Sequence, residues 1–271
     1  MTSDPNHDPT TLSLVTLNVL HDLATWDARA SLIVAGLRAL ASDVIALQEV
    51  DLRSDAAKWL AEALGGYSAF VTSGTGRRSG REGLALLSRL PTSRHEALVL
   101  GAQGRVAQRC VVAAGDTHWT VANVHLHFSV LDGRTRRSQA RRLLEWLPRA
   151  DHPTIVCGDF NARPGARTIS LMRQRFVSAQ SAVHGSDRLH TFPTGLHRGR
   201  SPRNRARGWI LRAAGTLLAR PGGTWSGTLD YVFVDPRVRV RECRLALHHP
   251  HPDDPRLFPS DHMALAAKLE W

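Results

Sequence analysis

An acidic residue and an amide residue, Asp159 and Asn161, follow directly after the apolar run Thr154–Cys157. The run is bounded by a proline and a glycine, which is typical of a short buried strand. At extended spacing the two polar side chains share one face of the chain, while Phe160 between them points into the core. A carboxylate and an amide at the end of a buried strand can hold a water molecule, a phosphoryl oxygen or a hard cation. The alternative is a purely structural Asx turn after the strand.

Other apolar runs begin or end with polar side chains in the same way. Each of these residues alone could be structural, as a turn former or as a hydrogen-bonded core histidine. Together they place several charges against apolar strands, where unpaired charge is costly. Pairing with one another and with a metal ion would remove that cost, so we expect them to form one site. The residues are Asn18, Glu49, His125, Asp230, Asp261 and His262.

Alternating strands and helices must position these side chains. Thr11–Leu20 alternates apolar and polar residues, which predicts the first strand. Trp26–Leu40 has apolar residues at a helical period, and the apolar run that closes on Glu49 predicts a second, buried strand. Ser54 is expected to cap a short helix that ends at Leu64.

The alternation continues along the rest of the chain. Val106–Ala114 and Thr117–His125 flank a Gly-Asp pair, which predicts a hairpin, and Arg134–Leu147 predicts a helix with a strongly basic outer face. Interleaved strands and helices without a dividing linker predict one α/β domain over residues 11–271. We expect a disordered tail at 1–10 and an Arg-rich insertion at about 185–224. The remaining predicted segments are strands at 67–72, 84–88, 229–234, 238–247 and 263–269, a helix at 167–176, a candidate amphipathic helix at 209–218 and a flexible basic loop at 74–81.

The composition allows a sizeable core and contains no candidate membrane span. The chain has 271 residues, of which 42% are hydrophobic, and no apolar run approaches the roughly 18 residues of a spanning helix. Its first residues are polar and contain proline, so we expect no signal peptide. Three cysteines in apolar stretches, without zinc-site or redox-pair spacing, favour buried reduced thiols in a cytoplasmic protein. They are Cys110, Cys157 and Cys243.

The formal net charge is +11, and eight arginines but one acidic residue lie between Asp187 and Arg220. This charge indicates a polyanionic partner, although a general arginine bias would also produce it. The arginines at 198–207 are either a solvated loop or a contact surface for nucleic-acid phosphates. The apolar residues that follow Trp209 also fit a helix on an anionic membrane surface or a lid over the site.

Seven short motifs stand in an order that resembles the endonuclease/exonuclease/phosphatase superfamily, the deoxyribonuclease-I-like metal-dependent phosphoesterases. Each motif is weak alone, and the specific signal is their order from about Leu12 to Trp271. The resemblance implies a four-layer sandwich of two packed β-sheets flanked by helices, with the active site at one end. Periodicity alone predicts only an α/β chain. The motifs are TLNVL, ALQEV, REGLALLSR, NVHLH, GDFNA, LDYVFV and SDH.

The resemblance implies a metal site and a catalytic dyad. Glu49 is expected to be the main ligand of Mg²⁺, with Mn²⁺ as the alternative ion. Asn18 and Asp261 are expected to assist, directly or through waters. Asp230 is expected to hold His262, orienting the imidazole and raising its basicity.

Further roles follow from the same resemblance. His125 is expected to face the phosphate as a donor or acid, oriented by Glu82. Asp159 is expected to bind or deprotonate the attacking water, a task that the resemblance leaves open between Asp159 and His262. Asn161 is expected to contact a phosphate oxygen. The other histidines of the motif-bearing and C-terminal segments are expected on the surface or in loops; they are His127, His248, His249 and His251.

The expected activity is hydrolysis of phosphoester bonds by in-line attack of water. The leading substrate is nucleic acid, cleaved by a phosphodiesterase or nuclease. His125 favours the deoxyribonuclease I, sphingomyelinase and deadenylase-like branches, since the apurinic-endonuclease branch usually carries another residue there. One alternative is a phospholipid or sphingomyelin-type headgroup, or a small phosphate ester. The other is a non-catalytic binding module, against which the complete set of catalytic side chains argues.

Overall fold

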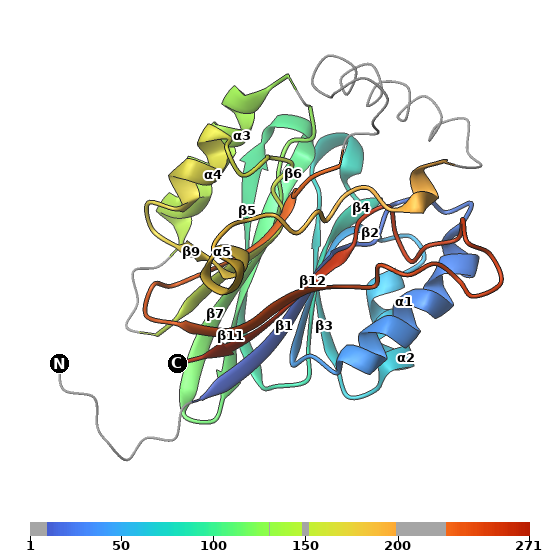
Figure 1. The fold of residues 1–271 in the computed structure, drawn as a ribbon, viewed down its shortest axis with the longest axis horizontal. Helices are drawn as coiled ribbons and strands as arrows, with labels where there is room; N and C mark the ends of the chain where they lie inside the picture. The colour runs from blue at the N-terminus through green and yellow to red at the C-terminus, as the bar shows by residue number, and fades with distance from the viewer. Residues whose placement is uncertain (1–9, 130, 148–151, 199–225) are drawn as a thin grey trace.

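Two six-stranded β-sheets, packed face to face, form the centre of this computed structural model (Figure 1). The structure describes residues 10–129, 131–147, 152–198 and 226–271. Residues 1–9 of the tail predicted at 1–10 and residues 199–224 of the insertion predicted at about 185–224, with its candidate helix, lie outside these residues. No helix within the described ranges is long and apolar enough to cross a membrane.

Sheet A is built from β1 (Thr11–Asn18), β2 (Val44–Asp51), β3 (Ser68–Ser73), β4 (Glu82–Ser88), β11 (Arg239–Ala246) and β12 (Ala264–Glu270). Their spatial order is β11-β12-β1-β2-β4-β3. β1 and β2 run parallel and the other neighbours antiparallel. A parallel pair needs a crossover connection, and the helix α1 (Trp26–Leu40) provides it.

Sheet B repeats this plan with β5 (Thr92–Gly101), β6 (Arg105–Ala114), β7 (Thr117–His125), β8 (Thr154–Asp159), β9 (Val177–Ser178) and β10 (Asp230–Val234). Their order is β5-β6-β7-β8-β10-β9. The parallel pair is β7 and β8, and the helix α3 (Gly133–Trp146) connects them. Each sheet therefore has one central parallel pair between antiparallel strands.

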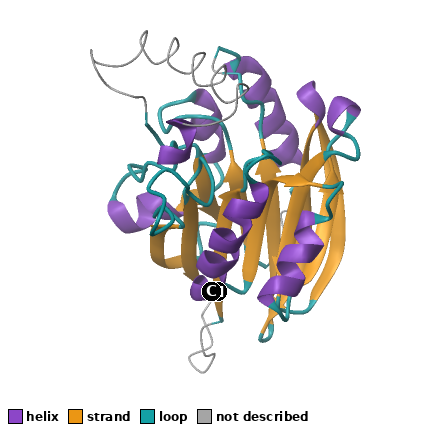
Figure 2. Ribbon diagram, turned by 90° about the vertical axis from the view of Figure 1, so that its right-hand side faces the viewer, coloured by secondary structure: helices purple, strands orange, loops and turns teal. Residues whose placement is uncertain are grey.

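Helices cover the outer faces of both sheets, so the molecule has four layers (Figures 1 and 2). α1 and α2 (Ala56–Leu64) pack on sheet A through an apolar cluster that includes Ile33 and Leu60. α3 and α4 (Arg167–Met172) pack on sheet B through a cluster that includes Leu143 and Ile169. A third cluster fills the space between the sheets. This arrangement confirms the predicted sandwich.

Strand alternation determines which side chains reach the inter-sheet space. In β1, Leu12 and Leu14 face the inter-sheet core, whereas Val15 and Leu17 face the helices. Because successive side chains alternate, Asn18 falls on the inter-sheet face at the last position of the strand. The same parity places His125 of β7 and Asp159 of β8 on that face, at the ends of their strands. The three predicted cysteines are also buried and free.

Some local predictions are wrong. Ser54 does not cap α2: its hydroxyl donates to Asp51 Oδ2 at 2.7 Å, and Asp55 precedes the helix with a φ of 50°. The helix predicted at 167–176 ends at Met172. β5 was not predicted because most of its side chains are exposed, and an edge strand need not show the apolar alternation of a half-buried one.

Candidate active site

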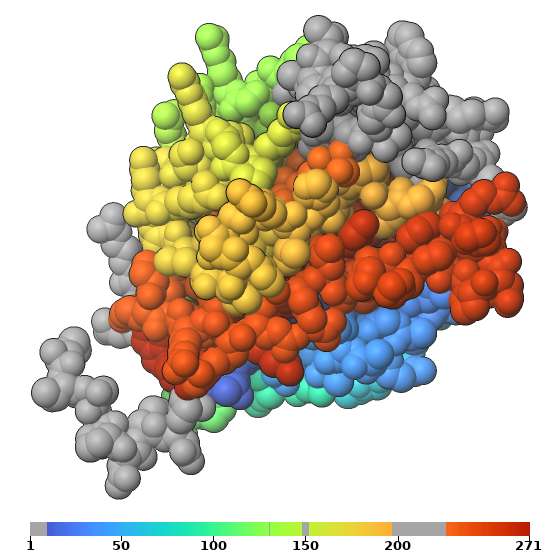
Figure 3. Space-filling view, viewed as in Figure 1, coloured from blue at the N-terminus to red at the C-terminus, as the bar shows by residue number. Residues whose placement is uncertain are grey.

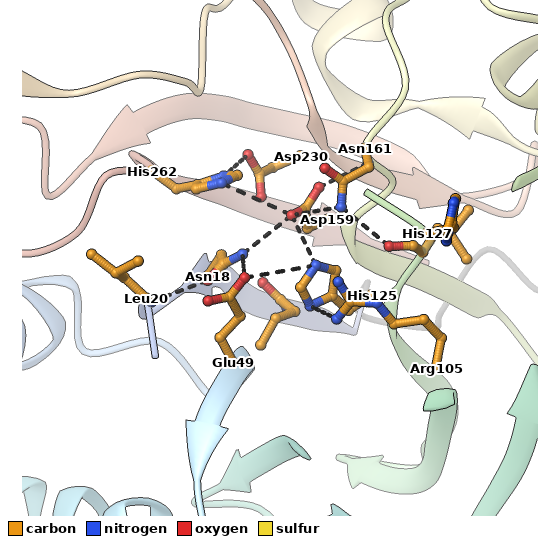
Figure 4. Close-up of polar contacts among 12 residues, drawn as sticks. Asn18, Leu20, Glu49, Arg105, His125, His127, Asp159, Asn161, Asp230 and His262 are labelled. Atoms are coloured by element: carbon orange, nitrogen blue, oxygen red, sulfur yellow. Dashed lines mark hydrogen bonds and ion pairs between the residues drawn. The ribbon is translucent and has the colours of Figure 1, made fainter. Parts of the chain in front are cut away.

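The two sheets bring the predicted polar residues together at one end of the inter-sheet core (Figure 4). The parallel strands β1, β2, β7 and β8 end there, and the antiparallel strands β4 and β10 begin there. Residues far apart in the sequence thereby become neighbours. The side chains that meet are Asn18, Glu49, Glu82, His125, Asp159, Asn161, Asp230 and His262.

Three neighbouring strands of sheet B place His125, Asp159 and Asp230 in one row. The register pairs His125 with Asp159, and Asp159 with Asp230. His125 Nε2 lies 3.3 Å from Asp159 Oδ2, and His262 Nε2 lies 3.9 Å from the same oxygen. Asp159 is 1% exposed, so its carboxylate is enclosed between two imidazoles.

Asp230 holds His262, as predicted. His262 Nδ1 lies 2.8 Å from Asp230 Oδ2, and both side chains are buried. Burial lowers the pKa of His262, but the carboxylates of Asp230 and Asp159 outweigh it and raise the pKa from 6.5 to about 10. In the metal-free protein the His262 imidazole therefore carries a positive charge at neutral pH.

Asn18 links the two sheets across the site. Its Nδ2 donates to Asp159 Oδ2 at 3.2 Å and to Glu49 Oε1 at 3.4 Å. Its Oδ1 accepts from the backbone N–H of Leu20 at 3.0 Å. The backbone bond fixes the orientation of the amide, so that its donor side faces the two carboxylates.

Glu49 reaches the site through a β-bulge. In β2, Leu47 faces α1 and α2, and Gln48 faces sheet B, so unbroken alternation would turn Glu49 towards the helices. The pairing of β2 with β4 shifts register between Gln48 and Val50, and Glu49 has a φ of 58°. The extra residue redirects its side chain into the site, where Oε2 accepts from the backbone N–H of His21 at 3.0 Å.

Arg105, which was not predicted from the sequence, contacts the ring nitrogen of His125 that points away from Asp159. Arg105 Nη1 lies 2.8 Å from His125 Nδ1. Glu82, which was expected to orient His125, accepts hydrogen bonds from Arg105, at 3.4 Å, and from Arg78. The predicted hairpin could have indicated this contact, because its register brings Arg105, the residue before Val106, next to the end of β7.

Burial and neighbouring charges lower the pKa of one of these side chains and raise the pKa of others. Burial and the Arg105 guanidinium lower the pKa of His125 well below 6.5. Burial and the Glu49 carboxylate raise the pKa of Glu82. Burial raises the pKa of Asp159 from 3.8 to about 7, although His262 opposes the shift. His125 is therefore neutral where His262 is cationic.

Asn161 completes the Asx turn of Asp159, and its side chain also points into the site. Its backbone N–H donates to Asp159 Oδ1 at 2.8 Å, and its φ is 48°. Its Nδ2 donates to Leu126 O at 3.1 Å and to Asp159 Oδ2 at 3.2 Å. The structural role of this residue is thus confirmed, and its side chain lies against the buried Asp159. Its contact with a phosphate oxygen stays a prediction.

The carboxylate oxygens of the site fit a hard divalent cation. Two groups of metal-capable side chains lie among the described residues: Glu49 with Glu82 and His125, and Asp159 with Asp230 and His262. Within each group the ligand atoms lie within 4.8 Å of one another. The raised pKa values of Glu82 and Asp159 mark carboxylates that a cation would stabilise in their ionised form.

Asp261 lies outside these two groups. Its Oδ1 accepts from the hydroxyl of Ser260 at 3.4 Å, and the side chain is half-buried. Its negative charge raises the pKa of the adjacent His262. A ligand role for Asp261 therefore stays a prediction, whereas its electrostatic support of His262 follows from its position.

His127 lies in the loop after β7, within the expected surface or loop positions, but it is buried, with only 6% of its surface exposed. Its backbone N–H donates to Gln139 Oε1 of α3 at 2.8 Å, and its Nε2 lies 3.4 Å from Asp132 Oδ2. Contacts from α3 cover this loop, which the sequence pattern did not indicate. His127 supports the loop that leaves the active site.

Arg29 of α1 is fully buried and joins the loops on either side of the site. Its guanidinium donates to Val19 O at 2.7 Å, to Leu20 O at 2.9 Å and to Pro259 O at 2.9 Å. The red segment that precedes β12 lies against the blue α1 in Figure 3. Arg29 stands one turn before Ile33 on the apolar face of the predicted helix, and this unusual position was the available signal.

Comparisons with known proteins agree with this fold and site. The model described as the Endonuclease/Exonuclease/phosphatase family matches residues 15–262. The Carbon catabolite repressor protein 4 homolog 6 of Arabidopsis thaliana is 26% identical over 187 residues, which cover 58% of this chain and 24% of that protein. The chain thus spans about a quarter of the length of this curated relative.

Solved structures share the fold at low sequence identity. TDP2 of D. rerio, complexed with single strand DNA product, has a TM-score of 0.75 and 16% identity, covering 96% of this chain and 98% of that chain. The human Nocturnin catalytic domain with bound sulfate anion has a TM-score of 0.70 and 22% identity, covering 96% and 93%. These likenesses confirm the deoxyribonuclease-I-like architecture.

Proposed function

The chain belongs to the endonuclease/exonuclease/phosphatase family, and we propose that it is a divalent-metal-dependent hydrolase of phosphoester bonds. The observation that carries the proposal is the set of groups around Asp159 Oδ2. Asn18 Nδ2 lies 3.2 Å, His125 Nε2 3.3 Å and His262 Nε2 3.9 Å from this oxygen. In-line attack of water on phosphorus needs such a convergence of base, donors and cation-binding carboxylates.

Glu49 is the proposed main ligand of the cation, with Asn18 and Asp261 assisting directly or through waters. Carboxylate and amide oxygens are the ligands that Mg²⁺ prefers. When bound, the cation neutralises charge on the phosphate and on the departing oxygen. The β-bulge at Glu49 supports this assignment, because it turns a carboxylate into the site against the strand alternation.

Asp159 is the proposed general base. Burial raises its pKa to about 7, and a base with a pKa near the operating pH combines ionisation with proton affinity. Its carboxylate takes a proton from water as the new oxygen–phosphorus bond forms and the bond to the leaving oxygen breaks. The cationic His262, held by Asp230, donates to a non-bridging phosphate oxygen, and Asn161 contacts another.

Nucleic acid is the proposed substrate class. The net charge of +11 supports it, and the similar D. rerio TDP2 was solved with a single strand DNA product. Arginines also follow site residues along the chain: Arg134 and Arg137 lie in the first turns of α3, after the strand that ends at His125, and Arg163 and Arg167 follow Asn161. Cationic side chains on these segments fit contacts with phosphates beside the cleaved one.

Two exposed apolar side chains favour a phospholipid or sphingomyelin-type headgroup as the second candidate. Phe128 is 44% exposed and Leu131 96% exposed. Both lie in the loop between His125 and α3, and the first turns of α3 carry several arginines. Apolar side chains beside basic ones are typical of a surface that inserts into anionic lipid.

The test is an assay of metal-stripped protein supplied with Mg²⁺ or Mn²⁺. The substrates are bis-p-nitrophenyl phosphate, single-stranded DNA, RNA and phospholipid vesicles. Asp159→Ala should lose activity by roughly 10² or more, whereas Asp116→Asn, in the exposed β6–β7 turn at the other end of the sandwich, should retain it. Phe128→Ser should spare the small diester and reduce vesicle hydrolysis only if lipid is the substrate. Folded wild-type protein that hydrolyses none of these esters would refute the proposal.

A further inference from the structure

Arg105 makes a contact that restricts the chemistry of His125. Arg105 is 3% exposed, and its Nη1 lies 2.8 Å from His125 Nδ1. A guanidinium group only donates hydrogen bonds. His125 Nδ1 must therefore accept, which means that it carries no proton. The single ring proton then lies on Nε2, which faces Asp159 Oδ2 at 3.3 Å.

Two interlocked loops hold Arg105 in this position. Glu82 Oε1 accepts from Arg105 Nη1 at 3.4 Å. Gly104, the residue before Arg105, has a φ of 67°, and a Cβ there would lie 1.9 Å from Thr75 O. Thr75 N–H donates to Gly104 O at 3.0 Å, and Arg78 Nε donates to Gln103 O at 3.0 Å. These bonds set the direction from which the guanidinium approaches the imidazole.

We propose that Arg105 is a positioning residue that keeps His125 as a neutral imidazole with its proton on Nε2. His125 then serves as a hydrogen-bond donor to a phosphate oxygen and not as the acid that protonates the leaving group. The assignment rests on the proposed phosphoesterase function and decides between the two roles that the sequence left open.

The contact differs from that of the other imidazole in the site. His262 Nδ1 faces a carboxylate, which accepts a hydrogen bond and stabilises a charged ring. His125 Nδ1 faces a cation, which donates and disfavours a charged ring. The two histidines therefore have different tasks: His262 is cationic and His125 is a neutral donor.

The first measurement is the ¹⁵N NMR signature of His125 in metal-free protein near pH 7, which needs no substrate. We expect Nδ1 without a proton and Nε2 with one. Arg105→Met should disturb this signature, whereas Arg81→Met, which removes an exposed arginine beside Glu82, should preserve it. A proton on Nδ1 of wild-type His125, either as the other tautomer or as imidazolium, would overturn the proposal.

Activity supplies the second measurement. His125→Gln keeps a side-chain N–H donor but cannot act as an acid, so it should retain roughly tenfold more kcat than His125→Ala. Equal losses would support the acid role and overturn ours. Arg105→Met should lower kcat roughly 10- to 100-fold, as removal of an orienting partner often does, and should cost nothing more in the His125→Ala background. Additive losses would show that Arg105 acts elsewhere.

These measurements separate two kinds of failure. If the enzyme hydrolyses no phosphoester but His125 shows the Nε2–H tautomer, the proposed function fails while the contact of Arg105 with His125 stands. If hydrolysis is found but Nδ1 is protonated, the function stands and the role of Arg105 is wrong. Since the His125 variants leave Arg105 in place, their comparison holds even if Arg105→Met does not fold.

Discussion

Asp230→Asn tests the dyad most directly, because it removes one charge and almost no volume. The amide oxygen of the substituted side chain can still accept from His262 Nδ1, which lies 2.8 Å from Asp230 Oδ2 in the wild type. A hydrogen bond to a charged group contributes about 1.5–3 kcal/mol, equivalent to about 1–2 pKa units at about 1.4 kcal/mol per unit. Asp159 and Asp261 still raise the pKa of His262. We therefore expect the pKa to fall from about 10 to roughly 8–9.

NMR titration of His262 in metal-free protein measures this fall. The loss in kcat/KM should be roughly 10- to 150-fold, from the same 1.5–3 kcal/mol. The double variant with His262→Ala should be no worse than the worse single variant, because the two side chains act as a unit. Asp235→Asn, just beyond the other end of β10, is the matched control and should change neither value. An unchanged His262 pKa in the Asp230 variant, or additive losses, would refute the reasoning.

The stability of the metal-free protein gives an independent check with a defined sign. The folded-state pKa of His262 lies above its ordinary value of 6.5. The stabilisation of the charged ring is therefore complete below pH 6.5 and is lost as the pH rises towards 10. Asp230→Asn lowers the upper end of this pH range, because it lowers the folded-state pKa of His262. Urea unfolding at pH 6.5 and pH 9.5 should show about 0.7–2 kcal/mol less pH dependence in the variant than in the wild type, whose ring is still mostly charged at pH 9.5.

Further changes test other parts of the site. Glu49→Gln should stay folded but need roughly 10- to 100-fold more Mg²⁺ for half-maximal activity, and unchanged activity at low Mg²⁺ would move the ligand elsewhere. Gly158→Ala should lower the free energy of unfolding by about 3 kcal/mol or more, since Gly158 has a φ of 131° and a Cβ would lie 2.1 Å from Val124 O; urea unfolding measures it. Arg29→Lys should lower kcat and also lower the free energy of unfolding by about 2 kcal/mol, because Lys cannot replace every hydrogen bond that joins Val19 and Pro259. A loss of stability with full kcat would show that Arg29 does not position the site.

Individual strands and helices could be predicted because hydrophobic periodicity is local, whereas the four-layer sandwich followed only from the family resemblance. The alternation over Thr11–Leu20 predicted β1, and Trp26–Leu40 is the observed α1. Glu49 shows where local patterns fail. Its charge and its place after an apolar run indicated a ligand, but only the bulge, formed by pairing with β4, determines which way it points.

Arg105 and Arg29 were missed for a different reason. An arginine in a sequence is normally solvent-exposed, and both of these arginines are buried because tertiary contacts supply their acceptors. Arg29 bonds the carbonyls of loops that meet only in the fold, and Arg105 bonds His125 across a hairpin. The sequence shows the donors but not the acceptors, which depend on how the sheets and loops pack.

One layer below the active site, Gln48 of sheet A and Asn123 of sheet B make directional bonds between the sheets. Gln48 Nε2 donates to Asn123 Oδ1 at 2.8 Å, and Asn123 Nδ2 donates to Leu47 O at 2.9 Å and to Ala85 O at 3.0 Å.

Apolar contacts alone tolerate small sliding movements of one sheet on the other, but these hydrogen bonds allow only one alignment. Distances in the proposed site that cross the sheets, such as Asn18 to Asp159, therefore depend on these hydrogen bonds more than on the shapes of the surrounding core side chains. Volume-conserving exchanges at Leu14 or Val121 are therefore accessible to an engineer who wants a more thermostable protein with an unaltered reaction centre.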